Sequence, residues 1–134
     1  MGARPLALLA LVALAALSLS VQALPTITSW RTANGARVLF VEARELPIVD
    51  VSVLFDAAGS RDGDRPGLAR LTNGLLAEGA GGLSADAIAE RFAALGANFA
   101  TASQRDMASA ELRTLSDAPT LEAALELAAN VVTR

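Results

Sequence analysis

The pattern of hydrophobic and polar positions changes character near residue 25. Before it, residues 6–19 form an apolar stretch that only serine interrupts. After it, short runs with β-type alternation are followed by longer runs with helical periodicity. The clearest alternation covers residues 48–57, where valine and phenylalanine alternate with aspartate and serine, the period-2 pattern of a strand with one face on a core. The chain therefore divides into an apolar leader and a patterned remainder.

The patterned remainder begins with strands. Residues 26–32 and 37–43 are β-type runs on either side of Asn34-Gly35, a strong signal for a two-residue hairpin turn. The alternating run at 48–57 follows them and ends in a polar turn. We expect a β-hairpin and then a third strand.

Two helical runs come next. Residues 67–78 carry leucines at spacings i, i+3, i+7 and i+8, and Gly79 stands where a left-handed cap belongs. The second run is preceded by Ser84, a good N-cap residue, and it ends at Gly96. The remaining patterns predict two strands and a last helix, over residues 97–104, 107–115 and from the cap at Ser116 or Asp117 onward.

The order of these elements is β-β-β-α-α-β-β-α. Because strands come in adjacent runs, the order favours an α+β fold with an antiparallel or mixed sheet and helices packed on one face. The last helix stays periodic up to Arg134, and no helix-stopping residue follows it. This predicts a domain that is truncated at its C-terminus.

The apolar leader has the features of a secretory signal peptide. Arg4 supplies a positive charge, the apolar run is shorter than the about 20 residues of a membrane span, and Val21 and Ala23 are small residues at positions −3 and −1 of a cleavage site. We predict a signal peptide over 1–23, cleavage after Ala23, and a periplasmic or secreted chain with no stable membrane span after processing. A retained membrane anchor is the alternative.

Composition excludes several classes of chemistry. The 134 residues contain no histidine, cysteine or tyrosine, and all 11 basic residues are arginine. Histidine-based triads, thiolate metal sites and disulfides are therefore excluded. The formal net charge of −3 gives no basic surface for nucleic acid, which we do not expect as a partner.

The first predicted helix carries the candidate site. At about 100° per residue, Arg70, Asn73 and Gly74 cluster on one side and the leucines cluster opposite. We expect the leucines to face the core and the other three residues to point away from it. Taken alone, this polar side also fits an ordinary solvated helix face that contains one glycine.

The short motifs along the chain resemble a known family. They are Gly59-Ser60-Arg61, Gly67-Leu68-Ala69, the run from Leu75 to Gly79, Ala89-Glu90-Arg91 and Leu95-Gly96-Ala97. In this order they resemble the N-terminal domain of the insulinase/pitrilysin family of zinc peptidases, inverzincins whose helix carries H-x-x-E-H after Gly-Leu-Ala. The resemblance implies a metallopeptidase-like half domain over residues 24–134.

The resemblance fails at the catalytic motif. The two histidine positions fall on Arg70 and Gly74, and the glutamate position falls on Asn73. In the active enzymes the histidines hold zinc and the carboxylate takes a proton from the zinc-bound water. We therefore predict no catalytic residue, no metal ligand and no cofactor here, with zinc only in a catalytic partner.

The resemblance is closer to the non-catalytic subunits of this family than to its active members. It implies a catalytically silent subunit, without peptidase activity of its own, that forms a heterodimer with an active relative and helps to enclose a peptide substrate. The alternative is a stand-alone peptide-binding or envelope scaffold domain without an enzymatic partner. An active peptidase that uses other residues would need a base and ligands that this sequence lacks.

Two loop motifs have weaker functional readings. Residues 62–67 begin like a calcium loop, but Pro66 occupies a ligand position. We therefore expect the aspartates of this segment to be solvated residues of a turn. The glycine-rich residues 78–82 lack the lysine of a phosphate loop, which favours a flexible connection between two helices over an anion site.

Overall fold

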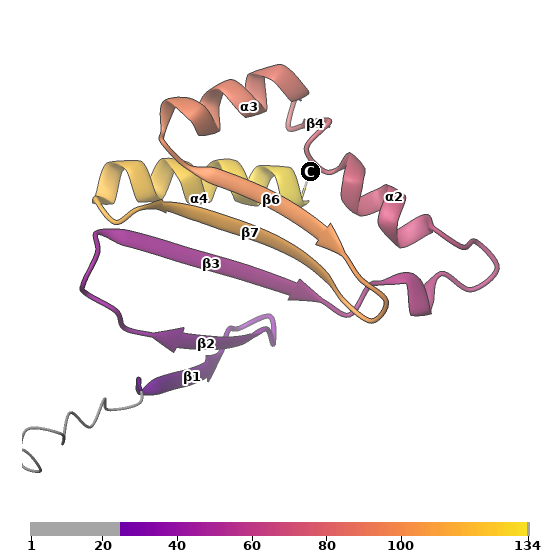
Figure 1. Ribbon diagram of the computed structural model, residues 1–134, viewed down its shortest axis with the longest axis horizontal. Helices are drawn as coiled ribbons and strands as arrows, with labels where there is room; N and C mark the ends of the chain where they lie inside the picture. Colours follow the sequence, from indigo (N-terminus) through magenta and orange to yellow (C-terminus); the bar gives the residue numbers. More distant parts are fainter. Residues whose placement is uncertain (1–24, 134) are drawn as a thin grey trace, which may run out of the picture. The chain divides into compact units, whose positions relative to one another are not determined.

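A computed structural model gives the structure of the chain and describes residues 25–133. The signal-peptide prediction for residues 1–23 lies outside the described residues. The chain divides into two compact units, Met1–Arg44 and Glu45–Arg134, which are described separately (Figure 1).

The first unit contains the predicted β-hairpin. Strand β1 (Ile27–Arg31) pairs antiparallel with β2 (Arg37–Val41). A backbone hydrogen bond of 2.9 Å from Thr32 N to Ala36 O closes a three-residue loop, in which Gly35 takes the positive φ of 88°. The hairpin is confirmed, but the loop is one residue longer than Asn34-Gly35 alone predicts, as in three-residue hairpins with a left-handed glycine.

The second unit is built on a three-stranded antiparallel sheet. Its strands are β3 (Ile48–Phe55), β6 (Asn98–Ser103) and β7 (Ala108–Leu115), in the order β3-β7-β6. Val51 and Phe99 lie on either side of Leu112 in register, so all three point to the same face.

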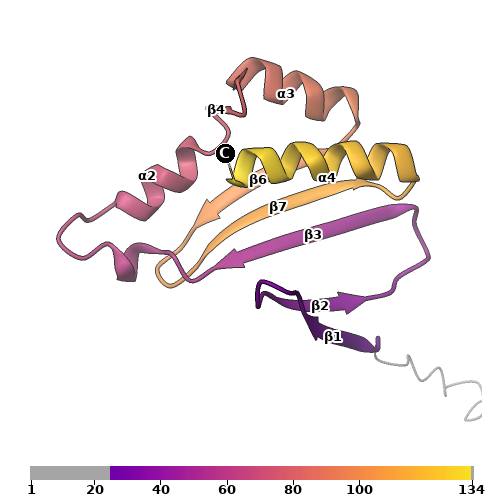
Figure 2. The ribbon, with the colours of Figure 1, turned by 180° about the vertical axis from the view of Figure 1, so that it is seen from behind.

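Three helices lie on that face: α2 (Leu68–Leu75), α3 (Ala85–Ala94) and α4 (Ala118–Thr133) (Figures 1 and 2). Ser84 caps α3 as predicted, because its Oγ accepts a hydrogen bond from Ala87 N at 3.3 Å. The α+β fold with helices on one face of an antiparallel sheet is confirmed.

The core of this unit lies between α3, α4 and the sheet. Its buried members are Ala80, Ile88, Phe92, Leu112, Ala124, Leu127 and Val131. Phe92 of α3 stacks on Phe99 of β6 with 5.1 Å between ring centroids. Helix α2 contributes none of the buried apolar residues of this cluster.

Ordered structure replaces two predicted connections. A 3₁₀ turn η1 (Gly59–Arg61) precedes α2, and a small antiparallel hairpin of β4 (Gly79–Ala80) and β5 (Leu83–Ser84) follows it. Gly81 and Gly82 form the turn of that hairpin with φ of 57° and 83°, a conformation that glycine adopts without strain. The prediction of a flexible connection over residues 78–82 is therefore wrong.

Candidate functional site

Helix α2 is fixed at its start by Asp62. The two carboxylate oxygens accept hydrogen bonds from Gly67 N at 2.6 Å and Ala69 N at 2.8 Å. Gly67 has φ of 93° and offers no side-chain cap of its own. Asp62 thus satisfies N–H groups that the helix cannot satisfy, which is a structural role and not that of a solvated turn residue.

Asn73 is the buried residue of α2, with 7% of its surface exposed. Its Nδ2 donates a hydrogen bond to the backbone oxygen of Ser109 in β7 at 3.4 Å. The hydroxyl of Thr101 in β6 donates to the Asn73 backbone oxygen at 3.1 Å. The residue at the glutamate position of the motif therefore ties α2 to two strands.

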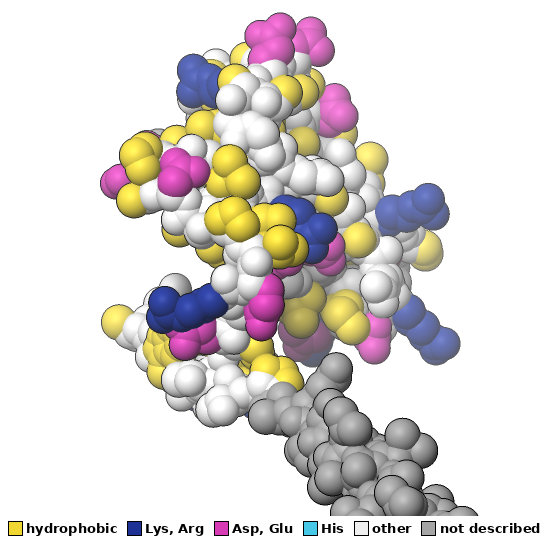
Figure 3. Space-filling view, turned by 60° about the vertical axis from the view of Figure 1, so that its left-hand side comes forward, with side chains coloured by type: hydrophobic (Ala, Val, Ile, Leu, Met, Phe, Trp, Pro, Cys, Tyr) yellow, Lys and Arg dark blue, Asp and Glu magenta, His cyan; other side chains and the backbone are white. Residues whose placement is uncertain are grey.

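The predicted orientation of α2 is wrong. Leu68, Leu71 and Leu75 are 45%, 61% and 53% exposed, whereas Asn73 points into the domain. Periodicity identifies an amphipathic helix, but it does not say which stripe meets the sheet. Small and polar inward residues keep the helix close to β6 and β7, and the leucines remain outside. On the face of the molecule in Figure 3, which is not centred on α2, hydrophobic side chains also reach the surface beside arginine and acidic groups.

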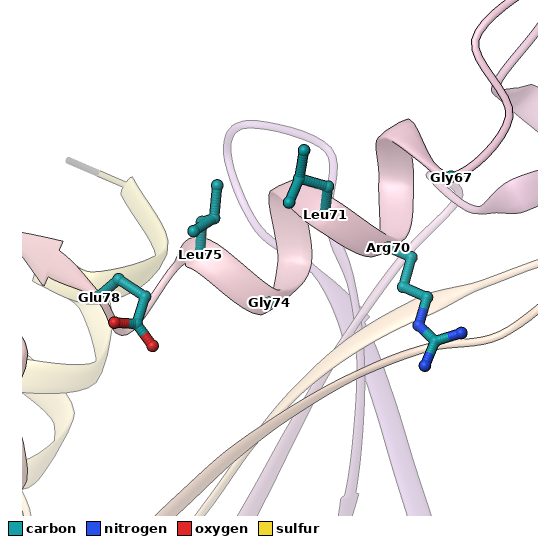
Figure 4. Close-up of a pocket in the computed structure, with 6 residues that line it drawn as sticks. All are labelled: Gly67, Arg70, Leu71, Gly74, Leu75 and Glu78. Atoms are coloured by element: carbon teal, nitrogen blue, oxygen red, sulfur yellow. The ribbon is translucent and has the colours of Figure 1, made fainter.

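The outer side of α2 borders an open cavity of about 530 Å³. Its lining residues are Gly67, Arg70, Leu71, Gly74, Leu75 and Glu78. Figure 4 shows the side chains of Arg70 and Glu78 on one side of the helix and the two leucines on the other, with Gly74 between the charged residues. Within residues 25–133, none of the ion pairs involves Arg70 or Glu78.

The three motif positions do not fit a zinc ion. Arg70 presents a cation, Gly74 has no side chain, and the Asn73 amide is directed to Ser109 O. In the part of the chain that the structure describes, no three His, Cys, Asp or Glu side chains are grouped to hold a metal. The positions that form the zinc site in active insulinase-type helices thus supply neither ligands nor a base.

A second polar surface lies on the sheet face opposite the helices. Arg113 of β7 donates hydrogen bonds from Nε and Nη2 to the Asp50 carboxylate of β3, at 2.7 and 2.9 Å. These hydrogen bonds lower the pKa of Asp50 below its usual value of 3.8. Ser52, Asn98 and Glu111 lie beside this pair around an open cavity of about 480 Å³.

Two solved structures resemble this chain along most of its length. The crystal structure of a peptidase M16 inactive domain from Pseudomonas fluorescens is 50% identical over 80% of this chain, with a TM-score of 0.79. The chain belongs to the peptidase M16 family, the insulinase family. A protease from Helicobacter pylori shares the fold at 22% identity over 81% of the chain, with a TM-score of 0.69.

This M16 chain spans about a quarter of each solved structure, 26% in both cases. No family model and no curated protein matches the sequence. The resemblance that the short motifs indicated is confirmed by the solved structures.

The sequence pattern found the position of Asn73 but not its partners. The Ser109 contribution is a backbone oxygen, which no side-chain pattern reveals. Thr101 could have been suspected, because it occupies an inward position of the alternating strand over 97–104.

In the described range 25–133, no helix is long and apolar enough to cross a membrane.

Proposed function

We propose that this chain is a catalytically silent M16 domain. The observation that carries the proposal is the state of α2: the position of the catalytic base holds Asn73, buried and hydrogen-bonded to β7. A buried amide can neither take a proton from water nor reach a metal on the outer side of the helix. The M16 relative from Pseudomonas fluorescens, which is named an inactive domain, supports the same conclusion.

The proposed role is that of a non-catalytic subunit. It pairs with an active M16 peptidase as a heterodimer, helps to enclose peptide substrates, and takes part in their degradation or processing. Zinc belongs to the catalytic partner alone, because Arg70 would repel a dication and Gly74 offers no ligand. The chain itself contributes binding surface and no reacting group.

The proposal includes export and a domain boundary. Cleavage after Ala23 would deliver residues 24–134 to the periplasm or the exterior as the N-terminal part of an insulinase-type domain. The apolar run of residues 6–19 and the small residues before the cleavage point support this location.

Zinc analysis and co-purification test the proposal together. The tagged chain, isolated from its own cells, is expected to carry no stoichiometric zinc and to bring along an M16 peptidase with an intact H-x-x-E-H motif. Peptide hydrolysis by that peptidase should rise when this chain is added. Stoichiometric zinc that is lost in Arg70→Ala or Asn73→Ala would overturn the silent site. Full activity of the peptidase alone would instead favour a stand-alone scaffold domain.

A further inference from the structure

The sequence contains two Asn-Gly pairs, and the structure places them in opposite surroundings. Asn34-Gly35 lies in the loop of the β1–β2 hairpin, whereas Asn73-Gly74 lies inside helix α2, where Asn73 is 7% exposed. In such a pair, the backbone nitrogen of the glycine can attack the side-chain amide carbon of the asparagine before it. Because the two reacting atoms belong to neighbouring residues, the reaction depends on the geometry of the pair itself.

The hairpin loop holds the nitrogen of Gly35 lightly. This nitrogen donates one backbone hydrogen bond, to Thr32 O at 2.9 Å. A Cβ built on Gly35 would meet no atom of the described structure within 4 Å, so the approach to Asn34 is unhindered. Loops are among the parts of a fold that open most readily, and opening this one bond frees the nitrogen for attack.

A hydroxyl group lies at the oxygen that gains charge in this attack. Thr32 Oγ1 donates a hydrogen bond to the side-chain oxygen of Asn34. When the nitrogen adds to the amide carbon, negative charge develops on that oxygen, and a donor already aimed at it stabilises the transition state. The same hydroxyl lies 3.3 Å from Ala36 O, so its place is within the loop.

The buried Asn-Gly pair lacks this arrangement. The N–H of Gly74 belongs to the hydrogen-bond ladder of α2. The Asn73 amide donates to Ser109 O at 3.4 Å, and its backbone oxygen accepts a hydrogen bond from Thr101. Freeing this asparagine requires α2 to separate from the sheet, which costs more than opening a loop. The second pair should therefore stay intact.

We propose that Asn34-Gly35 is a site of spontaneous deamidation and that the hydroxyl of Thr32 promotes it. Gly35 N forms a bond to Asn34 Cγ, and the bond from Cγ to the amide nitrogen breaks. The amide nitrogen leaves as ammonia with the proton of Gly35 N, and a five-membered succinimide ring remains. Water then opens the ring at either carbonyl and gives aspartate or isoaspartate. The loop gains a negative charge, and isoaspartate also adds a carbon to its backbone. This proposal does not rest on the proposed function.

Peptide mass spectrometry tests the site on the protein isolated from its own cells and aged at mildly alkaline pH. Because all basic residues are arginine, trypsin releases residues 32–37 and 71–91 as separate peptides. Peptide 32–37 should be converted at least about tenfold faster than peptide 71–91, since its asparagine lies in a loop and not in a buried helix. Its products should be two peptides of equal mass that chromatography separates, one with aspartate and one with isoaspartate. A sample digested before ageing corrects for conversion during digestion.

Thr32→Val tests the role of the hydroxyl. The variant keeps a branched side chain and should slow the conversion of Asn34 by about two- to tenfold, the effect of one hydrogen bond. Thr32→Ser keeps the hydroxyl and should react at close to the natural rate. Thr28→Val is the matched control, because it makes the same change in strand β1, and no hydrogen bond of the described structure joins Thr28 to Asn34.

Three results would overturn the proposal. They are an unmodified peptide 32–37, equal conversion of the two peptides, and a Thr32→Val variant that reacts as fast as the natural chain or the Thr28→Val control. Circular dichroism of each variant shows that it is folded.

Discussion

The side-chain amide of Asn73 reaches across to β7 and donates a hydrogen bond to the Ser109 carbonyl oxygen, 36 residues away, with 3.4 Å between Nδ2 and O. The direction of this bond matters. A carbonyl oxygen only accepts hydrogen bonds, so the side chain at position 73 must donate. An ionised carboxylate cannot, and the position therefore suits a structural amide and not a catalytic base.

Replacing this amide by a carboxylate should destabilise the domain. We expect Asn73→Asp to lower the free energy of unfolding by about 2–3 kcal/mol at pH 7, because a buried charge would face a carbonyl oxygen. Burial raises the pKa of the new carboxyl, and its protonated form can donate to Ser109, so the loss should shrink as the pH falls. Urea unfolding at pH 7 and pH 4.5 measures both effects.

Asn98→Asp is the control for this change, because Asn98 is exposed on β6. It should alter the free energy of unfolding by less than about 0.5 kcal/mol. An equal loss in both variants, or no loss at Asn73, would contradict the structural role of the amide.

The sequence was sufficient for the order and type of the main elements. Both alternation and helix capping depend only on residues that are near in sequence. The alternating residues 48–57 contain a strand, and the serine before residues 85–94 caps a helix. The small β4–β5 hairpin was not predicted, because two-residue strands carry no periodic signal. Its turn depends on the left-handed conformations of Gly81 and Gly82. From composition alone, these glycines predict a flexible connection.

The orientation of α2 could not be read from its sequence. Its leucine stripe is the stronger apolar signal, yet Asn73 on another side is the buried residue. Two hydrogen bonds with Thr101 and Ser109 hold that side on the sheet. Such partners come from distant parts of the chain, so periodicity within one helix cannot supply them. Arg70, Asn73 and Gly74 all lie on this helix, and their assignment as altered site positions stays a prediction.

The cap of α2 by Asp62 offers a second test. Asp62→Ala removes the acceptor of two backbone N–H groups and should cost about 1–2 kcal/mol of unfolding free energy. Asp64→Ala in the same turn is the control and should change little, because no hydrogen bond from α2 reaches its carboxylate in the described structure. Urea unfolding measures both, and equal losses would contradict a specific cap.

The Asp50–Arg113 pair predicts a pH dependence of stability. Hydrogen bonds from Arg113 lower the pKa of Asp50 in the folded state below its usual value of 3.8. The pair therefore stabilises the fold at pH values above 3.8. That contribution is lost as the pH falls through the lowered pKa. The pair is exposed, so the effect is small and weakens with salt. Arg113→Gln should move the NMR-measured pKa of Asp50 up toward 3.8, and an unchanged pKa would contradict the pairing.

Placing histidines at positions 70 and 74, where the family motif has them, should create a metal site on α2. In Arg70→His with Gly74→His, two imidazoles stand at i and i+4 on one side of α2, and a Cβ at position 74 meets no atom within 4 Å. Calorimetric titration with zinc should show binding at pH 7.5 that disappears below about pH 6, as the imidazoles take up protons. Arg70→His with Thr72→His is the matched control, since residues two apart do not face each other and should bind far more weakly. Peptide hydrolysis should stay absent in the binding variant, because Asn73 still occupies the position of the base. Equal binding by the control, or zinc bound to the natural chain, would show that α2 is not the altered metal helix.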